Sequence, residues 1–101
     1  MLTSVDADVI RVLGDPLRLQ IVTLLAQETL CTTHLVEETG AKQTNLSNHM
    51  KVLREAGLVE TEPCGRFTYY KLRPEVLTSL SGRFAELAAS ARTAADNKRA
   101  C

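Results

Sequence analysis

The sequence predicts one mostly helical domain that carries a small β-hairpin, and three observations support this. Apolar residues recur at three- and four-residue spacing through most of the chain, which is the period of amphipathic helices. Between residues 58 and 72, two short β-prone runs instead flank the turn sequence Pro63-Cys64-Gly65. The 101 residues include four aromatic side chains and no tryptophan, so the expected core is small and aliphatic.

Two helices are expected in the first quarter of the chain. Residues 5–13 place apolar side chains at helical spacing, and Gly14 ends this helix. Asp15 and Pro16 begin the second helix, because Asp is a favoured N-cap and Pro loses nothing at the first helical position. The buried stripe of this helix, which runs to about Gln27, consists of Leu17, Ile21, Leu24 and Leu25.

Residues 30–40 are expected to form a short strand, a helix and a tight turn. Leu30-Cys31 is the extended piece and a candidate third strand beside the hairpin. Thr32 or Thr33 can cap the helix that follows, and Gly40 supplies the turn that ends it. A short helix and a glycine-containing turn before a second helix are typical of a helix-turn-helix.

The segment 42–57, KQTNLSNHMKVLREAG, is expected to be that second helix, and its two faces differ. At about 100° per residue, Leu46, Met50 and Leu53 form one narrow apolar stripe. The opposite face carries small, amide, hydroxyl and cationic side chains. Such a face allows close approach, and Asn or Gln on it can pair with adenine edges in a major groove. The alternative is a surface helix that happens to be rich in Asn and Ser.

The two β-prone runs, Leu58–Glu62 and Phe67–Leu72, are expected to form the hairpin. Arg66 lies next to its turn, where a hairpin tip can lower a cation into a minor groove. The alternative for Arg66 is a loop cation without a partner. Another cation, Arg18, lies off the apolar stripe of its helix and is either solvated or placed against a backbone phosphate.

Pro74 begins the last expected helix, at the first helical position. Its apolar stripe is long for the end of so small a domain and consists of Val76, Leu77, Leu80, Phe84, Leu87, Ala88 and Ala91. We expect this stripe to pack, with the first helix, on a second copy of the chain, and the alternative is packing within one chain. Residues 1–94 then form the domain, and residues 95–101, which lack apolar spacing, form a flexible tail.

The formal net charge is zero, which alone argues against a nucleic-acid partner, but the charge is unevenly distributed. Residues 1–41 carry two cations and six anions, net −4. Residues 42–73 carry six cations and three anions, net +3. A homodimer would double this positive segment on one face.

Several other classes of protein are not expected. No apolar run approaches about 20 residues, so no membrane span is predicted, and the acidic N-terminus lacks the pattern of a signal peptide. A cytoplasmic location follows, in which three cysteines, an odd number, are expected to be thiols. The chain is not expected to be an enzyme, because no nucleophile has a base partner at a readable spacing and no glycine-rich phosphate loop occurs.

The expected order of helix, helix, short strand, helix, helix, hairpin and long helix is that of a winged helix-turn-helix. From Val9 to Glu75 the sequence resembles the ArsR/SmtB family of dimeric metal-sensing repressors, most closely in SNHMKVLREAGLV at Ser47–Val59. The resemblance implies a homodimer that occupies an imperfect inverted repeat in double-stranded operator DNA and needs no cofactor to bind it. The helix at 42–57 would be the recognition helix in the major groove, and the hairpin would be the wing.

The resemblance also carries DNA contacts onto this chain. The residues implied to face DNA are Gln43, Thr44, Asn45, Ser47, Asn48, Lys51 and Arg66. His49 matches a family position at the flank of the recognition helix. There it either reaches a phosphate or packs as a hydrogen-bonded side chain.

The inducer is less well defined, because the chain departs from the family pattern. Arsenic and antimony sensors carry a box of the type Cys-Val-Cys-Asp-Leu-Cys, where this chain reads CTTHLV and keeps only Cys31. Zinc sensors of the family carry Asp and His ligands on the last helix, and that site is absent because residues 74–98 contain no His. Members that use an N-terminal cysteine are also excluded, because residues 1–30 contain no Cys. The remaining candidate ligands for As(III) or Sb(III) are Cys31, Cys64 and Cys101, with Cys31 foremost.

Alternatives stay open for these cysteines. Cys64 at the wing tip is expected more than about 15 Å from Cys31 at the wing base, so a shared site would need the tail or the partner subunit. His34 with Cys31 is a second candidate pair, for a divalent metal. If they bind no metal, Cys31 is a buried strand residue, Cys64 is a turn residue and Cys101 is a loose terminal thiol. The alternative functions are a repressor that responds to thiol oxidation and a dimeric interaction domain that does not bind DNA.

Overall fold

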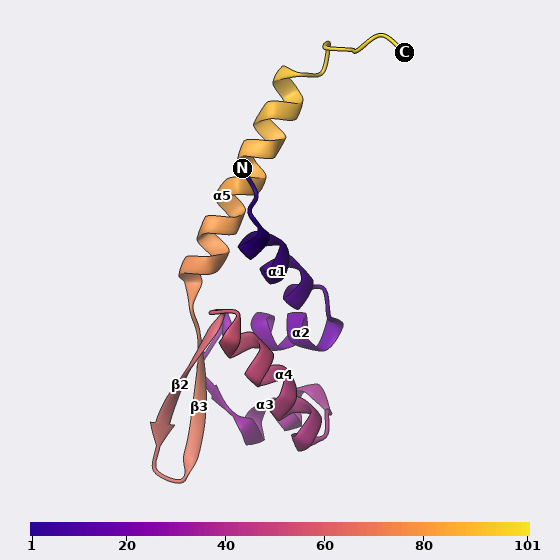
Figure 1. Ribbon diagram of the computed structural model, residues 1–101. Coiled ribbons are helices and arrows are strands. Elements are labelled where there is room, and N and C mark those ends of the chain that lie inside the picture. Colours follow the sequence, from indigo (N-terminus) through magenta and orange to yellow (C-terminus); the bar gives the residue numbers. More distant parts are fainter.

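The computed structural model describes residues 1–101 and shows five α-helices with a three-stranded antiparallel sheet. The elements are, in order, α1 (Ser4–Leu13), α2 (Pro16–Leu25), β1 (Leu30–Cys31), α3 (Thr32–Thr39), α4 (Gln43–Glu55), β2 (Val59–Cys64), β3 (Phe67–Leu72) and α5 (Pro74–Thr93). The molecule measures 63 × 23 × 22 Å, because α5 extends away from the hairpin end (Figure 1). The predicted winged helix-turn-helix is confirmed.

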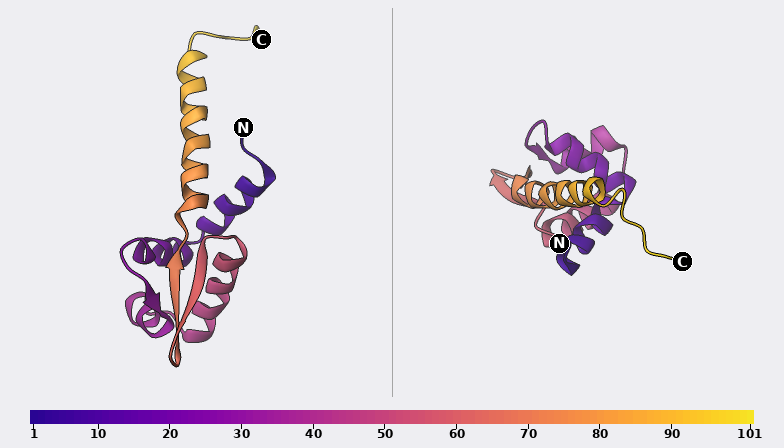
Figure 2. Two further views of the ribbon diagram at one scale, coloured as in Figure 1. Left: turned by 90° about the vertical axis from the view of Figure 1, so that its left-hand side faces the viewer. Right: turned by 90° about the horizontal axis from the view of Figure 1, so that it is seen from above.

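The core lies where α2, α3 and α4 meet the base of the sheet. Figure 2 shows these helices on the two sides of the hairpin, with α5 rising from its base. Each fully buried aliphatic side chain contributes about 1.5–3 kcal/mol, so this cluster holds the three helices together. The largest side chains in it, all less than 2% exposed, are Ile21, Leu35, Leu46, Met50, Leu53, Leu58 and Val59.

Helix starts follow the predicted signals in two places and depart from them in a third. Asp15 caps α2, and proline occupies the first turn of both α2 and α5. The start of α3 differs, because its N-cap is Cys31 rather than Thr32 or Thr33. The N–H of Cys31 donates to Nδ1 of His34 at 3.2 Å, so His34 takes the part that Glu or Gln has in a capping box.

The sheet has the order β1-β3-β2, which confirms Leu30-Cys31 as the third strand. The predicted turn is displaced along the chain, because Pro63 and Cys64 belong to β2 and Cys64 pairs with Phe67. Proline is tolerated there because β2 is an edge strand. The turn itself is Gly65-Arg66, and the φ of 61° at Gly65 suits glycine.

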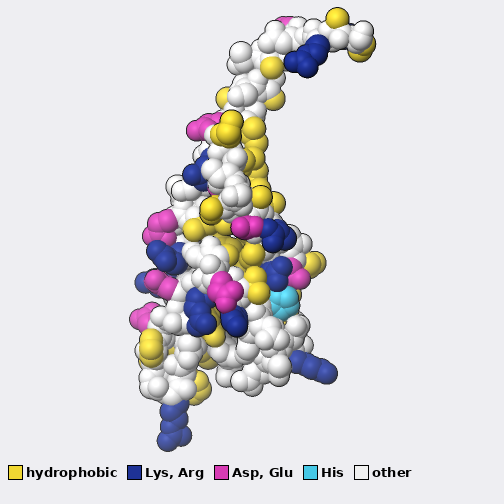
Figure 3. Space-filling view, in the orientation of Figure 1, with side chains coloured by type: hydrophobic (Ala, Val, Ile, Leu, Met, Phe, Trp, Pro, Cys, Tyr) yellow, Lys and Arg dark blue, Asp and Glu magenta, His cyan; other side chains and the backbone are white.

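The last helix makes few contacts within its own chain. Of the 20 residues of α5 only Leu80 is buried, and Phe84 and Leu87 are 45% and 50% exposed. Figure 3 shows hydrophobic side chains along the stem of the molecule that α5 forms. No helix in the structure combines the length and the apolar character needed to cross a membrane.

Candidate nucleic-acid interface

The two faces of α4 are separated as the sequence predicts. Leu46, Met50 and Leu53 are at most 1% exposed and anchor the helix in the core. The residues predicted to face DNA are all exposed: Gln43, Thr44, Asn45, Ser47, Asn48 and Lys51. The outer surface of α4 therefore consists mainly of amide, hydroxyl and cationic groups, with Glu55 as an exposed anion in its last turn, and it suits hydrogen bonding to base edges and phosphates.

The turn before α4 fixes the angle at which this helix leaves α3. Gly40 has φ 73°, a left-handed conformation that glycine adopts without strain. The Thr39 hydroxyl donates to the carbonyl of Leu35 at 2.6 Å and accepts from the N–H of Ala41 at 3.2 Å, so both sides of the turn are tied. No side chain caps α4 at its N-cap residue Lys42, which leaves the N–H groups of the first turn without a side-chain acceptor.

The wing ends in an exposed cation. Arg66 follows Gly65 in the turn and is exposed, as are Cys64 and Phe67 on either side. Figure 3 shows Lys and Arg side chains projecting from the lower end of the molecule, where Figure 1 places the hairpin tip and the α3–α4 turn. The wing and the recognition helix therefore present positive charge at the same end of the domain.

His49 lies at the flank of α4 and is held from behind by Arg18. The NH1 of Arg18 is 3.3 Å from Nδ1 of His49, and its Nε donates to the carbonyl of Val12 at 2.7 Å. Both side chains are half-buried. His49 is therefore packed and hydrogen-bonded on its Nδ1 side, and this contact leaves Nε2 free for another partner. The partners of Arg18 escaped sequence reasoning, because 31 residues separate Arg18 from His49 and no local pattern links them.

Asp15 stabilises the backbone at the same corner. Its carboxylate accepts from the N–H groups of Leu17 at 2.9 Å and of Arg18 at 3.1 Å. The hydrogen bond from the backbone of Arg18 lowers the pKa of the Asp15 carboxyl below its ordinary value, burial opposes this, and the charges of His49 and of the Arg18 side chain add to the lowering. An anionic cap therefore holds the helix from which Arg18 reaches α4.

The three cysteines lie apart within one chain. Cys31 is buried, Cys64 and Cys101 are exposed, and all three are free thiols. On the two sides of β3, Cys31 pairs with Tyr69 and Cys64 with Phe67. Two strand spacings and a two-residue offset separate the Cα atoms of Cys31 and Cys64 by roughly 12 Å, too far for a disulfide. The chain contains no group of three or more His, Cys, Asp or Glu side chains that could hold a metal ion.

The surroundings of Cys31 differ from the expectation in two respects, the first being that Cys64 is roughly 12 Å away rather than more than about 15 Å. Cys31 lies beside the middle of the wing rather than at its base, because β1 pairs with Tyr69 and Tyr70 of β3. The ring of His34 meets Tyr69 edge-on, with centroids 6.0 Å apart. Nδ1 of His34 already accepts from the backbone of Cys31, so only Nε2 remains for another partner. A shallow cavity of about 360 Å³ adjoins these side chains and Glu37.

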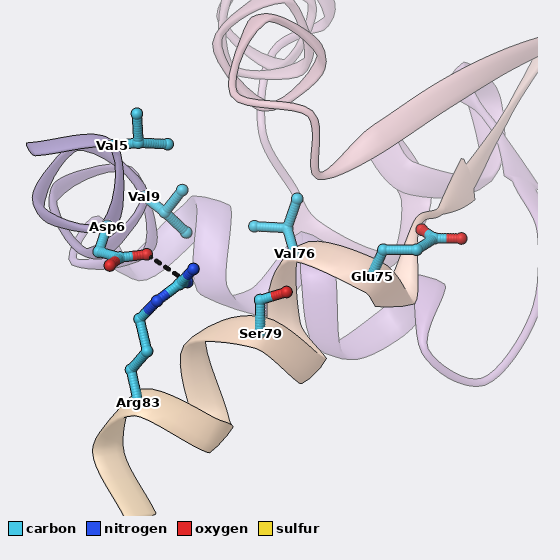
Figure 4. A pocket seen from close by; sticks show the side chains of 7 residues that line it. All are labelled: Val5, Asp6, Val9, Glu75, Val76, Ser79 and Arg83. Carbon is cyan, nitrogen blue, oxygen red and sulfur yellow. Dashed lines mark hydrogen bonds and ion pairs between the residues drawn. The ribbon is translucent and has the colours of Figure 1, made fainter. Parts of the chain in front are cut away.

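A second polar contact joins α1 to α5 on the opposite side of the domain. Figure 4 shows Arg83 of α5 reaching Asp6 of α1, with the two charged atoms 2.8 Å apart, beside a cavity of about 250 Å³. The side chain of Asp6 is only 6% exposed. The N–H of Thr3 lowers the pKa of the Asp6 carboxyl, burial opposes this, and the Thr3 hydroxyl and Arg83 lower it further. The Asp6 carboxylate thus accepts hydrogen bonds from three donors, which are the N–H and the hydroxyl of Thr3 and the guanidinium of Arg83.

Comparison with known proteins shows that the chain is similar to bacterial transcriptional regulators of one family. The family described as "Bacterial regulatory protein, arsR family" matches residues 15–61, a range that runs from the N-cap of α2 into β2 and includes all of α4. Over 69 residues the chain is 41% identical to the arsenical resistance operon repressor of Staphylococcus xylosus, covering 68% of this chain and 66% of the relative. Over 72 residues it is 35% identical to the repressor of the same name from Staphylococcus aureus, covering 71% and 69%.

The likeness extends to a solved structure. The homodimeric winged helix-turn-helix DNA-binding domain of Mb0332 from Mycobacterium bovis superposes with a TM-score of 0.70 at 26% identity, covering 96% of this chain and 89% of that chain. The chain thus spans nearly all of that domain but about two thirds of the length of the two staphylococcal relatives.

Proposed function

The chain belongs to the arsR family of bacterial regulatory proteins, and from this membership we propose that it is a homodimeric transcriptional repressor that binds operator DNA and releases it on binding arsenite or antimonite. The operator is double-stranded DNA that contains an inverted repeat. Repression works by occupancy in the cytoplasm, because a bound dimer excludes the polymerase. DNA binding itself requires no cofactor.

The outer face of α4 carries this proposal. Its exposed amides and hydroxyls match the donor and acceptor pattern of base edges, and Asn48 and Gln43 are the side chains for adenine. Lys51 contributes a point charge for a phosphate, and Arg66 enters the flanking minor groove from the wing. A protein-interaction domain is disfavoured as the alternative, because an interface centre would be apolar and aromatic there.

The dimer supplies the second half of the interface. Val5 and Ile10 of α1 are 68% and 40% exposed, and Phe84 and Leu87 of α5 are about as open, so both helices present apolar area to a second copy. The relative from Mycobacterium bovis is described as homodimeric. A two-fold dimer places its two recognition helices about 34 Å apart, one turn of DNA, which accounts for the inverted repeat.

The inducer is a thiophilic species that the cysteines bind. Two relatives are named for arsenical resistance, and all three cysteines of this chain are free thiols. As(III) is bound by three thiolates. Because Cys31 and Cys64 lie apart within one protomer, such a site needs Cys64 of the partner subunit, or Cys101 brought in by the tail, beside Cys31. Cys31 is the foremost ligand, because it adjoins α3 and so the base of the helix-turn-helix. Thiol oxidation is the second candidate trigger, favoured by the exposure of Cys64 next to Arg66.

A binding experiment tests the DNA contacts. A duplex is selected from a random library with the wild-type protein, and its affinity is then measured by fluorescence anisotropy. The variant Asn48→Ala with Lys51→Ala should bind about 100-fold more weakly, because each half-site loses a base contact and a phosphate contact. Thr78→Ala, an exposed change on α5, is the matched control and should leave the affinity unchanged. Equal affinity of the double variant and the wild type contradicts the assignment of α4.

A release experiment tests the trigger. The complex with DNA is titrated with arsenite, antimonite, cadmium, zinc and peroxide, using the wild type and the Cys31→Ser, Cys64→Ser and Cys101→Ser variants. We expect arsenite to release the DNA from the wild type and Cys31→Ser to require at least about tenfold more. An unaltered dose response in Cys31→Ser removes Cys31 from the site, whereas release by peroxide alone replaces arsenite with thiol oxidation.

A further inference from the structure

Arg18 joins three helices through one side chain. It lies on α2, its Nε donates to the Val12 carbonyl at the end of α1, and its NH1 contacts Nδ1 of His49 on α4 at 3.3 Å. Its guanidinium is planar, so these two bonds fix its orientation as well as its position. Through Arg18, the side chain of His49 is connected to the end of α1 as well as to α2.

The chemistry of the contact determines the proton on His49. Arginine has five N–H donors and no acceptor, so Nδ1 of His49 must be the acceptor. A ring that accepts at Nδ1 is neutral and carries its proton on Nε2. The contact with Arg18 therefore selects one of the two tautomers and leaves the Nε2–H at the other edge of the ring as a donor.

The position of His49 on the helix places its side chain next to residues that are predicted to face DNA. Asn45 precedes His49 by four residues and shares its flank of α4, and Asn48 is its neighbour in sequence. Both asparagines are exposed, whereas His49 is half-buried. The ring thus lies at the border between the core, where Arg18 holds it, and the outer face of α4.

We propose that Arg18 is a positioning residue for DNA binding, which acts by holding His49 as the Nε2–H tautomer so that His49 donates one hydrogen bond to a backbone phosphate. This rests on the proposed function as a DNA-binding protein. Arg18 itself does not touch DNA. Neutral His49 binds the phosphate as a donor, without contributing a positive charge.

The tautomer is measured directly by long-range ¹H–¹⁵N NMR correlations of the imidazole nitrogens in the free dimer. The chain has only two histidines, and each accepts at Nδ1, His34 from the Cys31 backbone and His49 from Arg18. In the wild type both should be Nε2–H tautomers. Arg18→Ala should convert His49 to a mixture of tautomers and leave His34 unchanged as an internal control. If the His49 pattern is the same in Arg18→Ala, the proposal is overturned.

DNA affinity supplies the second measurement. Arg18→Ala should bind the selected duplex about 30-fold more weakly, because each half of the dimer loses one oriented hydrogen bond. The slope of log affinity against log salt should stay as in the wild type, whereas a direct phosphate contact by Arg18 would lower it by about 0.9 in each half-site. Arg11→Ala removes the same charge from an exposed site on α1 and should change neither value. A reduced slope in Arg18→Ala overturns the positioning role.

Variants of His49 separate this role from a purely structural one. His49→Gln keeps an acceptor and a donor and should stay within about threefold of the wild type, while His49→Leu should lose as much affinity as Arg18→Ala. The double variant should be no weaker than either single variant, since the two residues act in series. Additive losses, or full affinity of His49→Leu, contradict the proposal. If the wild-type protein selects no duplex at all, the proposed function fails. If the wild type selects a duplex but Arg18→Ala binds it with equal affinity, only the positioning role of Arg18 fails.

Discussion

The helix-turn-helix and the α1–α5 pair both contain amphipathic helices, but the apolar stripe is covered in the first and exposed in the second. In α4 the apolar stripe is covered within the chain, and Met50 and Leu53 are at most 1% exposed. In α5 a stripe of similar spacing stays open, with Phe84 at 45% exposure and only Leu80 buried. An apolar face that its own chain leaves open is a surface for another molecule. The first region therefore folds on its own contacts, whereas the second is the region that we propose a second copy completes.

The two regions are connected through α1. On one side Asp6 of α1 receives Arg83 from α5 at 2.8 Å, and on the other the carbonyl of Val12 receives Arg18, which also holds α4 through His49. These bonds form a continuous set of polar contacts from α5 through α1 and α2 to the flank of α4. The contrast between a closed core and an open pair of helices can be tested by changing one residue on each side.

The largest effect is expected from Leu53→Ala, in the closed region. Leu53 is 0% exposed, so the change leaves a cavity and should lower the free energy of unfolding by about 2–5 kcal/mol. The loss should be the same at low and high protein concentration, because the site lies within one chain. Urea unfolding followed by circular dichroism measures both properties. Leu87→Ala is the comparison in the open region, and its effect should vary with protein concentration. A concentration-dependent loss in Leu53→Ala would remove the contrast between the regions.

Phe84→Asp should separate the dimer. An unpaired carboxylate in the apolar stripe of α5 would be buried by the partner copy, so the dissociation constant of the dimer should rise more than about 100-fold. Sedimentation velocity at micromolar concentration should then show a monomer with an unchanged helical content. Ala89→Asp places the same charge about 140° away around α5, at an exposed position, and should remain a dimer. A wild type that sediments as a monomer at this concentration rules out the dimer.

Asp6→Asn is expected to have a smaller effect that depends on pH. The pKa of Asp6 is lowered in the folded chain, first by the backbone of Thr3 and also by Arg83, so the carboxylate stabilises the fold at pH values above its unfolded pKa. That contribution is lost as the pH falls through the lowered pKa. The wild type should therefore be more stable than Asp6→Asn at pH 7, and the two should converge as the pH falls below the lowered pKa of Asp6. Asp8→Asn, exposed on the same helix, is the control, and urea midpoints measured across this range decide between them.

Local signals in the sequence were sufficient for most of the fold. Asp15-Pro16, the apolar spacing of α4 and the glycine at residue 40 each act through neighbours in the chain, and the structure has the elements that they predict. The errors arose where partners are distant. The N-cap of α3 was misplaced because an imidazole, rather than Glu or Gln, completes the capping box. The turn was misplaced because the tolerance of Pro63 depends on β2 being an edge strand, which only the pairing of β3 with β1 establishes.

The same reason limits prediction of the candidate site. The exposed face of α4 follows from helical period alone, whereas the partners of Arg18 and Asp6 come from helices 31 and 77 residues away. The relation of the cysteines also depends on strand register, which sets Cys31 beside Tyr69. Whether a partner subunit brings two thiols together depends on the geometry of the open region, which no spacing in the sequence encodes.

The smallest effect is expected from Arg66→Ala at the wing, and it distinguishes the proposed minor-groove contact of the wing from the base contacts of α4 in the major groove. Arg66 is exposed and held only by its turn, so it contributes charge rather than a fixed pairing, and affinity for the selected duplex should fall only about three- to tenfold. The salt slope should fall by about 0.9 for each wing, because each arginine displaces a counterion. Arg92→Ala removes an equal charge from the far end of α5 and should leave the slope unchanged. A slope that Arg66→Ala does not alter would mean that the wing stays clear of the DNA, and that the closed region binds through α4 alone.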